Sequence, residues 1–363
     1  MTSHVLSHYA LDGSVISCER YGCGHINETY LVHTASGKRY ILQKINHHIF
    51  KDVPGLMENI AAVTGFLRNR ETDPRRVLTL VPTAGGESYL QLEGGYWRVY
   101  DFVEGSICLQ APESKEDFYQ SAVAFGAFQQ QLQDFPAHTL HETIPNFHNT
   151  PSRFNDLKIA VENNASGRKD NALPEIEFAF AREKDCSVIT DLLGTEKVPL
   201  KVTHNDTKLN NVLFDKETKK GLCVVDLDTV MPGSALYDFG DSIRFGANTA
   251  AEDEKDLSKV SLSLEYFKAY VDGFLEAAGE SLTETEIELL PFAAKLLTFE
   301  CGMRFLGDYI NGDVYRGSKY AGGEFGHMAT HKLLIDDFCK AAYTGEKPVL
   351  NEKFAAKVNL PGL

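Results

Sequence analysis

The sequence predicts an α+β protein of two lobes: an N-terminal antiparallel sheet with one helix, then a larger and mostly helical C-terminal lobe. Three observations lead to this prediction. Short apolar runs joined by glycine-containing turns occupy residues 14–105 and are typical of hairpins. From residue 112 onwards, apolar residues recur every three to four positions, as in amphipathic helices. Within that part, two strand-length apolar runs at 202–226 flank a polar loop. We therefore expect lobes of residues 1–105 and 106–363.

The composition suits a globular protein and argues against several classes of partner. Its 363 residues are 43% apolar, enough for two lobes with a substantial core. The net charge is −15 and no basic stripe stands out, so we expect neither nucleic acid nor membrane as a partner. Seven cysteines without a Cys-x-x-Cys pair indicate reduced thiols rather than disulfides or a zinc site. Because no signal segment or long uncharged apolar run is present, the sequence predicts a cytoplasmic protein.

The first lobe is expected to consist of short strands and one helix. Strands are predicted, in order, at residues 14–21, 28–32, 39–44, 88–92 and 96–102. The helix is predicted at 54–70, where Pro54 suits a first turn and apolar residues recur on one face.

The second lobe is expected to be mostly helical. Helices are predicted at residues 114–132, 155–195, 257–275, 284–309 and 331–343. Ser114 and Asp117 have the spacing of a capping box at the start of the first helix, and its aromatic stripe is expected to face the core. Residues 144–153 are expected to form a loop, and the polar residues 163–167 to interrupt the second helix.

The polar loop between the two apolar runs carries the residues of phosphoryl transfer. It contains His204-x-Asp206 and then Asn211, and the second run ends at Asp226. Transfer from ATP needs a carboxylate facing the attacking hydroxyl, and amide and carboxylate oxygens that hold Mg²⁺. Protein kinases place an Asn five residues after the base, and a metal-binding Asp at a later strand end. The pattern predicts Asp206 as the base and Asn211 and Asp226 as magnesium ligands. A polar turn between two strands is the simpler alternative.

Three neighbouring residues have other expected roles. His204 is expected to pack beneath the loop and fix its backbone. Asp228 is a further candidate magnesium ligand, either directly or through water. Asp238 begins an Asp-Phe-Gly triplet, but no apolar run precedes it, so we expect it to cap a helix or brace the catalytic loop.

These motifs resemble those of the aminoglycoside phosphotransferase and choline kinase-like superfamily. The resembling segments are residues 203–211, 226–234 and 238–246, together with 24–27 and 300–306. Within the superfamily they are most similar to the branch of N-acetylhexosamine 1-kinases, and the resemblance covers nearly the whole chain. It implies a protein-kinase-like fold that binds ATP and Mg²⁺ between the lobes. It also implies transfer of the γ-phosphoryl group to the anomeric hydroxyl of N-acetylglucosamine or N-acetylgalactosamine.

The resemblance also implies substrate-binding residues. His25, Arg304 and Tyr315 would contact the hexosamine, and Asp206 would touch its O1. From the residues alone, His25 is an ordinary loop histidine. Arg304 has the alternative of an ion pair with Asp308, one turn further along its helix, or with another acid.

Nucleotide-binding residues are expected at three places in the first lobe. Gly22 and Gly24 let the backbone approach a phosphate, although a plain hairpin turn has the same glycines. Gln43 stands where kinases have a phosphate-binding lysine. Lys44 faces the other way and could contact the phosphates only if a bulge shifts the strand; the third alternative is that no lysine contacts them. In this superfamily a hinge between the lobes reads adenine through its backbone. The backbone of Asp101, Phe102 and Val103 is our candidate, with an ordinary edge strand as the alternative.

Two other functions stay open at this point. One is another small-molecule kinase of the superfamily, acting on an aminoglycoside, choline, homoserine or a methylthio sugar. The other is an inactive relative that binds nucleotide or sugar, which the glutamine at the lysine position would suit. The intact set of Asp206, Asn211 and Asp226 argues against inactivity.

Overall fold

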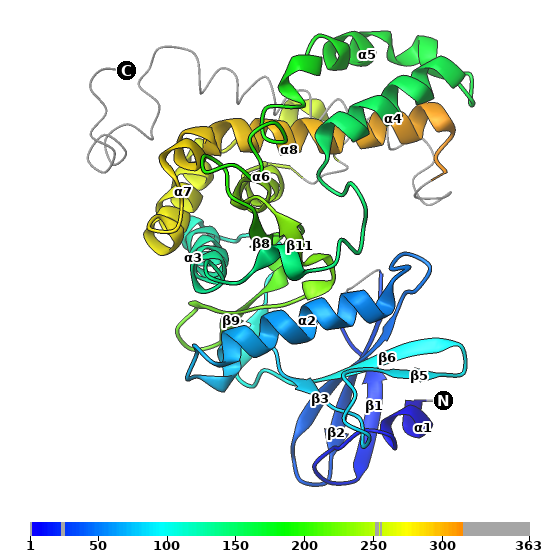
Figure 1. The fold of residues 1–363 in the computed structure, drawn as a ribbon, viewed down its shortest axis with the longest axis vertical. Helices are drawn as coiled ribbons and strands as arrows, with labels where there is room; N and C mark the ends of the chain where they lie inside the picture. Colours follow the sequence, from blue (N-terminus) through cyan, green and yellow to red (C-terminus); the bar gives the residue numbers. More distant parts are fainter. Residues whose placement is uncertain (1, 23–25, 251–253, 255, 315–363) are drawn as a thin grey trace.

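The first lobe is built around a twisted antiparallel sheet. The computed structural model describes residues 2–22, 26–250, 254 and 256–314. Neighbouring strands follow the order β1-β2-β3-β6-β4, and β5 pairs with β6 at one end. The strands are β1 (Val15–Arg20), β2 (Glu28–Thr34), β3 (Arg39–Ile45), β4 (Leu80–Val81), β5 (Leu90–Leu92) and β6 (Gly95–Asp101). The sheet lies at one end of the molecule and most of the helices lie at the other, with helix α2 between them (Figure 1).

Helix α2 (Val53–Arg68) joins the sheet to the second lobe. Its N-terminus is capped by Asp52, whose carboxylate accepts from the Gly55 N–H at 3.0 Å. Its buried side chains belong to an apolar cluster that also contains residues of the strands after position 200. Asn59 donates to the Val230 carbonyl at 3.0 Å, so the helix is hydrogen-bonded as well as packed across the lobes. The short helix α1 (Thr2–Leu6), which the sequence did not predict, covers the other face of the sheet.

After β6 the chain enters the second lobe. Strand β7 (Ser106–Cys108) pairs with β9 (Val212–Asp215), which also pairs with β10 (Gly221–Val224). A second ladder joins β8 (Lys201–Thr203) to β11 (Met231–Gly233). Since β6 ends in the first sheet and β7 begins in the second, we keep the proposed lobe boundary at residues 105 and 106.

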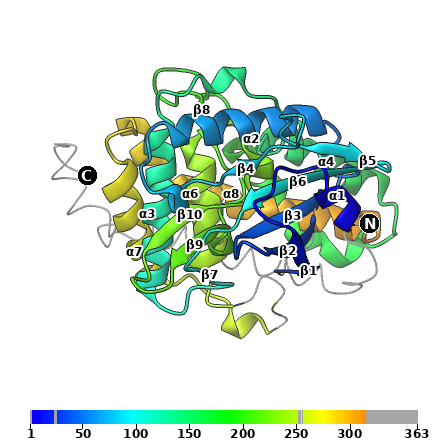
Figure 2. The same ribbon diagram turned by 90° about the horizontal axis from the view of Figure 1, so that it is seen from below.

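Helices make up most of the second lobe. They are α3 (Lys115–Gln131), α4 (Thr150–Asn163), α5 (Leu173–Phe180), α6 (Ala235–Gly246), α7 (Leu264–Ala278) and α8 (Glu284–Asn311). The predicted capping box of Ser114 and Asp117 is present at the start of α3. Helices α3 and α7 lie side by side in both views, and α8 runs along α4 and α6 (Figures 1 and 2). The predicted α+β fold, with its antiparallel sheet and larger helical lobe, is thereby confirmed.

The predicted boundaries differ from the observed ones in three places. Helix α4 begins at Thr150, inside the predicted loop, because Asn149 caps it by accepting from the Ser152 N–H at 3.1 Å. The predicted helix at 155–195 ends as regular structure at Phe180, and the one at 257–275 begins only at Leu264. The predicted helix at 331–343 lies outside the described residues.

Two further findings concern the described part of the chain. No helix there is both long enough and apolar enough to cross a membrane. Among its cysteines, Cys18, Cys186 and Cys223 are free thiols, which agrees with the expectation of reduced thiols.

Candidate active site

The loop between β8 and β9 is held by the carboxylate of Asp238 on α6. Its Oδ2 accepts from the His204 N–H at 3.0 Å, and its Oδ1 from the Asn205 N–H at 2.7 Å. Asn205 has a left-handed backbone (φ 65°), which turns these two N–H groups toward one acceptor. Gln129 of α3 donates to the same carboxylate at 2.5 Å. Burial raises the pKa of Asp238, although these donors and His204 oppose the rise. Asp238 therefore braces the loop, as expected, while Ser234 caps α6.

His204 fixes the loop from below and has no contact with solvent. Its Nε2 donates to the Val225 carbonyl at 2.9 Å, and its Nδ1 accepts from the Asp206 N–H at 3.3 Å. One neutral tautomer satisfies both bonds. The ring packs against Phe125 and Phe128 of α3. The expected structural role of His204 is confirmed, and the loop is tied to the end of β10 through it.

A second acid of α6, Asp241, holds the next part of the loop. It accepts from the Thr207 N–H at 3.0 Å and pairs with Arg244, which lies one turn later. Burial opposes the ionisation of Asp241, but Arg244 and nearby cations lower its pKa overall. Two carboxylates on one helix thus fix the backbone on both sides of Asp206.

Asp206 and Asn211 meet within this braced loop. The Asn211 Nδ2 donates to the Asp206 carbonyl at 2.7 Å and to its Oδ2 at 3.2 Å. Lys208, to which the sequence analysis gave no role, has its Nζ 3.2 Å from the Asp206 Oδ1. The Asp206 side chain keeps 30% of its surface exposed, so a substrate hydroxyl can reach it. The loop therefore presents a reachable carboxylate beside a cation.

Asp226 lies at the end of β10 and faces solvent. Its left-handed backbone (φ 58°, ψ 59°) starts the turn Leu227–Thr229. Crowding by protein atoms and then the charges of Asp228 and Asp206 raise its pKa to about 7. Because the side chain is exposed, we give more weight to the neighbouring carboxylates than to burial. An acid in such a setting favours a cation as its next neighbour.

Asp228, in contrast, is buried and both of its oxygens have protein partners. Its Oδ1 lies 2.5 Å from the Arg98 Nη1 of β6, and its Oδ2 accepts from the Asn27 Nδ2 at 2.5 Å. Because the carboxylate already has a cation as partner, it is less available to Mg²⁺ than that of Asp226, and its place in the magnesium shell stays a prediction. Neither Arg98 nor Asn27 was assigned a role from the sequence. A charged residue inside the apolar run 96–103 was the available signal for Arg98.

The remaining side chains fit a magnesium ion. The two bonds of the Asn211 Nδ2 orient the amide, and its Oδ1 has no hydrogen-bond donor among the residues described. In the same part of the chain, no donor contacts the Asp226 carboxylate. One amide oxygen and one carboxylate are ligands that Mg²⁺ takes in proteins, together with phosphate oxygens and water. No group of three or more His, Cys, Asp or Glu side chains in the described chain has metal-site geometry.

The hinge candidates differ in what their N–H groups do. The Asp101 N–H donates to the Thr79 carbonyl at 2.9 Å, and the Phe102 N–H to the Arg39 carbonyl at 3.1 Å. For the Val103 N–H we find no acceptor among the residues of the described ranges. Of the three N–H groups, only that of Val103 is therefore available to a base.

The strand that should carry a phosphate-binding lysine pairs regularly with both neighbours. Gln43 lies opposite Thr29 and Arg98, and Lys44 opposite Glu28 and Trp97, without a register shift. Alternation therefore places Lys44 on the other face of the sheet from Gln43. Its Nζ lies 3.8 Å from Glu28, so the expectation that Lys44 contacts nucleotide is not supported. On α2, Glu58 pairs with His141 at 2.7 Å and not with a lysine of this strand.

The expected substrate residues and the two glycines expected to bind nucleotide are only partly described. Gly24, His25 and Tyr315 lie outside the described residues; Gly22 is described, with a left-handed backbone (φ 76°) that suits glycine. Arg304 lies on α8, one turn after Glu300.

His148 connects Glu300 to the catalytic loop. Its Nδ1 lies 2.8 Å from Glu300, and its Nε2 3.2 Å from the Asn205 carbonyl. Burial lowers the pKa of His148, but the neighbouring Glu300 raises it overall. Burial opposes the ionisation of Glu300, but His148 and Arg304 lower its pKa overall. The structure thus joins the Arg304 region of α8 to the loop of Asp206 through a buried ion pair.

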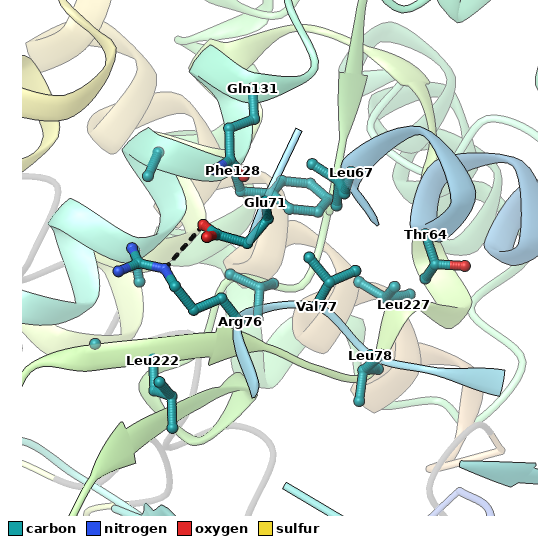
Figure 3. Close-up of a pocket in the computed structure, with 14 residues that line it drawn as sticks. Thr64, Leu67, Glu71, Arg76, Val77, Leu78, Phe128, Gln131, Leu222 and Leu227 are labelled. Carbon is teal, nitrogen blue, oxygen red and sulfur yellow. Dashed lines mark ion pairs between the residues drawn. The ribbon is translucent and has the colours of Figure 1, made fainter. Parts of the chain in front are cut away.

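A small cavity lies beside the site rather than in it. It has about 40 Å³ of free space between α2, α3 and β10. Figure 3 shows Glu71 and Arg76 paired at its edge among apolar side chains. Neither the catalytic loop nor Asp226 lines it, so we do not assign it to catalysis.

Comparison with known proteins shows the family and the fold of this chain. The profile of the phosphotransferase enzyme family matches residues 17–277. An amicoumacin kinase in complex with AMP-PNP, Ca²⁺ and Ami is 14% identical, with a TM-score of 0.60 over 96% of this chain and 93% of that one. Spectinomycin phosphotransferase in complex with ADP and spectinomycin is 13% identical, with a TM-score of 0.58 over 98% and 97%. A microcompartment-associated aminopropanol kinase is 16% identical, with a TM-score of 0.57 over 94% and 97%.

These structures share the fold of this chain, and the profile covers well over half of its length, including both aspartates of the proposed transfer site. The chain belongs to the phosphotransferase enzyme family.

Proposed function

We propose that this protein transfers the γ-phosphoryl group of ATP to the anomeric hydroxyl of N-acetylglucosamine or N-acetylgalactosamine. The observation that carries the transfer chemistry is the braced loop, in which Asp206 is reachable and lies beside Asn211 and Lys208. The sugar rests on the resemblance of residues 24–27, 203–211 and 300–306 to N-acetylhexosamine 1-kinases.

Each residue has a distinct task in this proposal. Asp206 orients the acceptor hydroxyl and takes up its proton. Asn211 and Asp226 hold Mg²⁺, which when bound neutralises charge on the phosphates. The Val103 N–H donates to adenine, and Lys208 supplies positive charge where negative charge develops during transfer. His25, Arg304 and Tyr315 contact the sugar.

A substrate panel tests this function directly. ADP release is measured with Mg²⁺-ATP and either N-acetylhexosamine, and the product is identified as a 1-phosphate or a 6-phosphate. Activity on N-acetylhexosamines no higher than on choline or aminoglycosides would refute the sugar assignment.

An Asp206→Asn variant tests the base. Losing a positioned general base typically costs about 10²–10⁴-fold in rate, so kcat should fall by that order while nucleotide binding stays close to wild type. Turnover at the wild-type rate in this variant would remove Asp206 from the role. Nucleotide affinity, measured by calorimetry without acceptor, shows whether the site is still intact.

A second acceptor class has an observation in its favour. One of the similar structures is an aminopropanol kinase, whose name indicates an amino-bearing acceptor. The net charge of −15 would suit a cationic acceptor. The same panel distinguishes the two, because a cationic acceptor would be phosphorylated in preference to the neutral sugars.

A further inference from the structure

Arg98 is a charged side chain buried inside the first sheet. Only 1% of its side chain is exposed, and it lies in the middle of strand β6. Its Nε donates to the Gln43 Oε1 at 2.9 Å, and its Nη1 lies 2.5 Å from the Asp228 Oδ1. A guanidinium in such a place is costly unless it is paired, and its partner here belongs to the other lobe.

The neighbour of Arg98 across the strands is the residue at the expected lysine position. Gln43 and Arg98 lie opposite each other in the pairing of β3 with β6, and their side chains are hydrogen-bonded on the α2 face, where Arg98 also touches Met57. Lys44 lies on the opposite face. The positive charge next to the expected lysine position therefore comes from the adjacent strand.

We propose that Arg98 takes the place of the missing strand lysine by fixing the Asp226–Asp228 turn for magnesium and nucleotide. This inference rests on the proposed phosphoryl transfer, but not on the identity of the acceptor. Arg98 is a positioning residue, since it acts through Asp228.

The contacts around Asp228 show why the turn needs such an anchor. Three carboxylates, those of Asp206, Asp226 and Asp228, lie near one another and repel. Arg98 neutralises the buried one, and Asn27 holds the same carboxylate while accepting from the Asn46 N–H at 2.9 Å. Because Asp228 is fixed, Asp226 is held two residues earlier with its carboxylate toward solvent. Without the guanidinium, the buried carboxylate would lose its cation and would be held in the first lobe by the Asn27 amide alone.

The test compares variants on the two faces of the same strand pair. Arg98→Gln removes the cation, and Lys44→Met removes the cation on the far face as a matched control. For each variant, the affinity for a non-hydrolysable ATP analogue is measured by calorimetry at a series of Mg²⁺ concentrations, without acceptor. We expect Arg98→Gln to raise the Mg²⁺ concentration for half-maximal nucleotide binding at least tenfold, and Lys44→Met to leave it within twofold. Wild-type Mg²⁺ dependence in a folded Arg98→Gln protein would overturn the proposal.

A charge exchange covers the case in which Arg98→Gln does not fold. The double variant Gln43→Lys, Arg98→Gln returns a cation to the same face of the sheet from β3. We expect it to fold and to bring the Mg²⁺ concentration for half-maximal nucleotide binding most of the way back to the wild-type value. A purely structural role for the guanidinium would not predict this recovery. A folded double variant that binds Mg²⁺-nucleotide as weakly as Arg98→Gln, or an unfolded one, would overturn the proposal. Failure of the sugar panel with normal nucleotide binding would refute the proposed acceptor only.

Discussion

Replacing Asp238 with asparagine tests how the catalytic loop is held. The carboxylate accepts three hydrogen bonds: Oδ1 from the Asn205 N–H, and Oδ2 from the His204 N–H and the Gln129 Nε2. An asparagine has one oxygen and one NH₂ group. Whichever way it is turned, the NH₂ faces at least one buried donor. One charge-assisted bond is lost, and one N–H is left unsatisfied.

The expected cost follows from these contacts. A hydrogen bond to a charged group is worth about 1.5–3 kcal/mol, and an unsatisfied buried donor costs about 1–3 kcal/mol. Part of this is offset, because burial raises the pKa of Asp238 and the neutral amide does not bear that penalty. We therefore expect Asp238→Asn to lower the free energy of unfolding by about 1–3 kcal/mol. Turnover should fall as well, because the His204 and Asn205 backbone places Asp206.

Urea denaturation read by two probes makes the test specific. Far-UV circular dichroism follows mostly the helical second lobe, whereas the single tryptophan, Trp97, lies in the first sheet. The dichroism midpoint should fall more than the fluorescence midpoint. Asp134→Asn, at a carboxylate that is 72% exposed, is the control and should change stability by less than about 0.5 kcal/mol. Unchanged midpoints together with wild-type turnover would refute the bracing role of Asp238.

Three more predictions concern the surrounding residues. Asp226→Asn should abolish turnover with Mg²⁺-ATP and, in metal-free buffer, raise the urea midpoint. Because the pKa of Asp226 is raised to about 7, ionisation costs stability, so the gain should grow from about pH 4 to 7 and be absent below that range. Glu300→Gln should cost less than the about 3–5 kcal/mol of a broken buried pair, since glutamine still bonds His148. The pKa of His148 is raised, so the stabilisation from its ion pair with Glu300 is fully present below about pH 6.5 and is lost as pH rises through the raised pKa. The free energies of unfolding of wild type and variant, measured in urea, should therefore converge at alkaline pH. Val103→Pro removes the N–H proposed to read adenine and should raise the KM for ATP more than that for the acceptor; equal changes would argue against the hinge assignment.

Local patterns in the sequence were enough to place the polar loop between two strands and to bring Asp206 and Asn211 together in it. The spacing of Asp206 and Asn211, and the position of Asp226 at a strand end, depend on neighbouring residues in the chain. Alternation along one strand also predicted that Gln43 and Lys44 face opposite ways. The same patterns predicted the sheet, the α2 helix and the helical second lobe.

Contacts between distant elements could not be predicted in this way. The pairing of Asp228 with Arg98 depends on how β6 of the first lobe meets the turn Leu227–Thr229 of the second, which periodicity does not show. The start of α4 was missed because the Asn149 cap lies within a stretch whose prolines indicated a loop. The start of α7 was placed too early, because apolar spacing continues through a short turn, Leu257–Lys259, before the Ser263 cap.

The acids around the loop are sorted by the partners that other elements provide. Asp238 and Asp241 hold backbone N–H groups of the loop, and Asp228 holds Arg98. Their carboxylates are bonded to groups of the protein, so replacing them should first lower the free energy of unfolding. Asp206 is contacted by side chains of its own loop and Asp226 by no hydrogen-bond donor of the described chain, and both are reached by solvent. A phosphoryl-transfer site needs charge that is kept in place but not neutralised. In the proposed site, Asp238 and Asp241 fix the backbone of the loop and Asp228 anchors the turn to the first lobe, while Asp206 and Asp226 keep exposed surface for the proposed hydroxyl and metal.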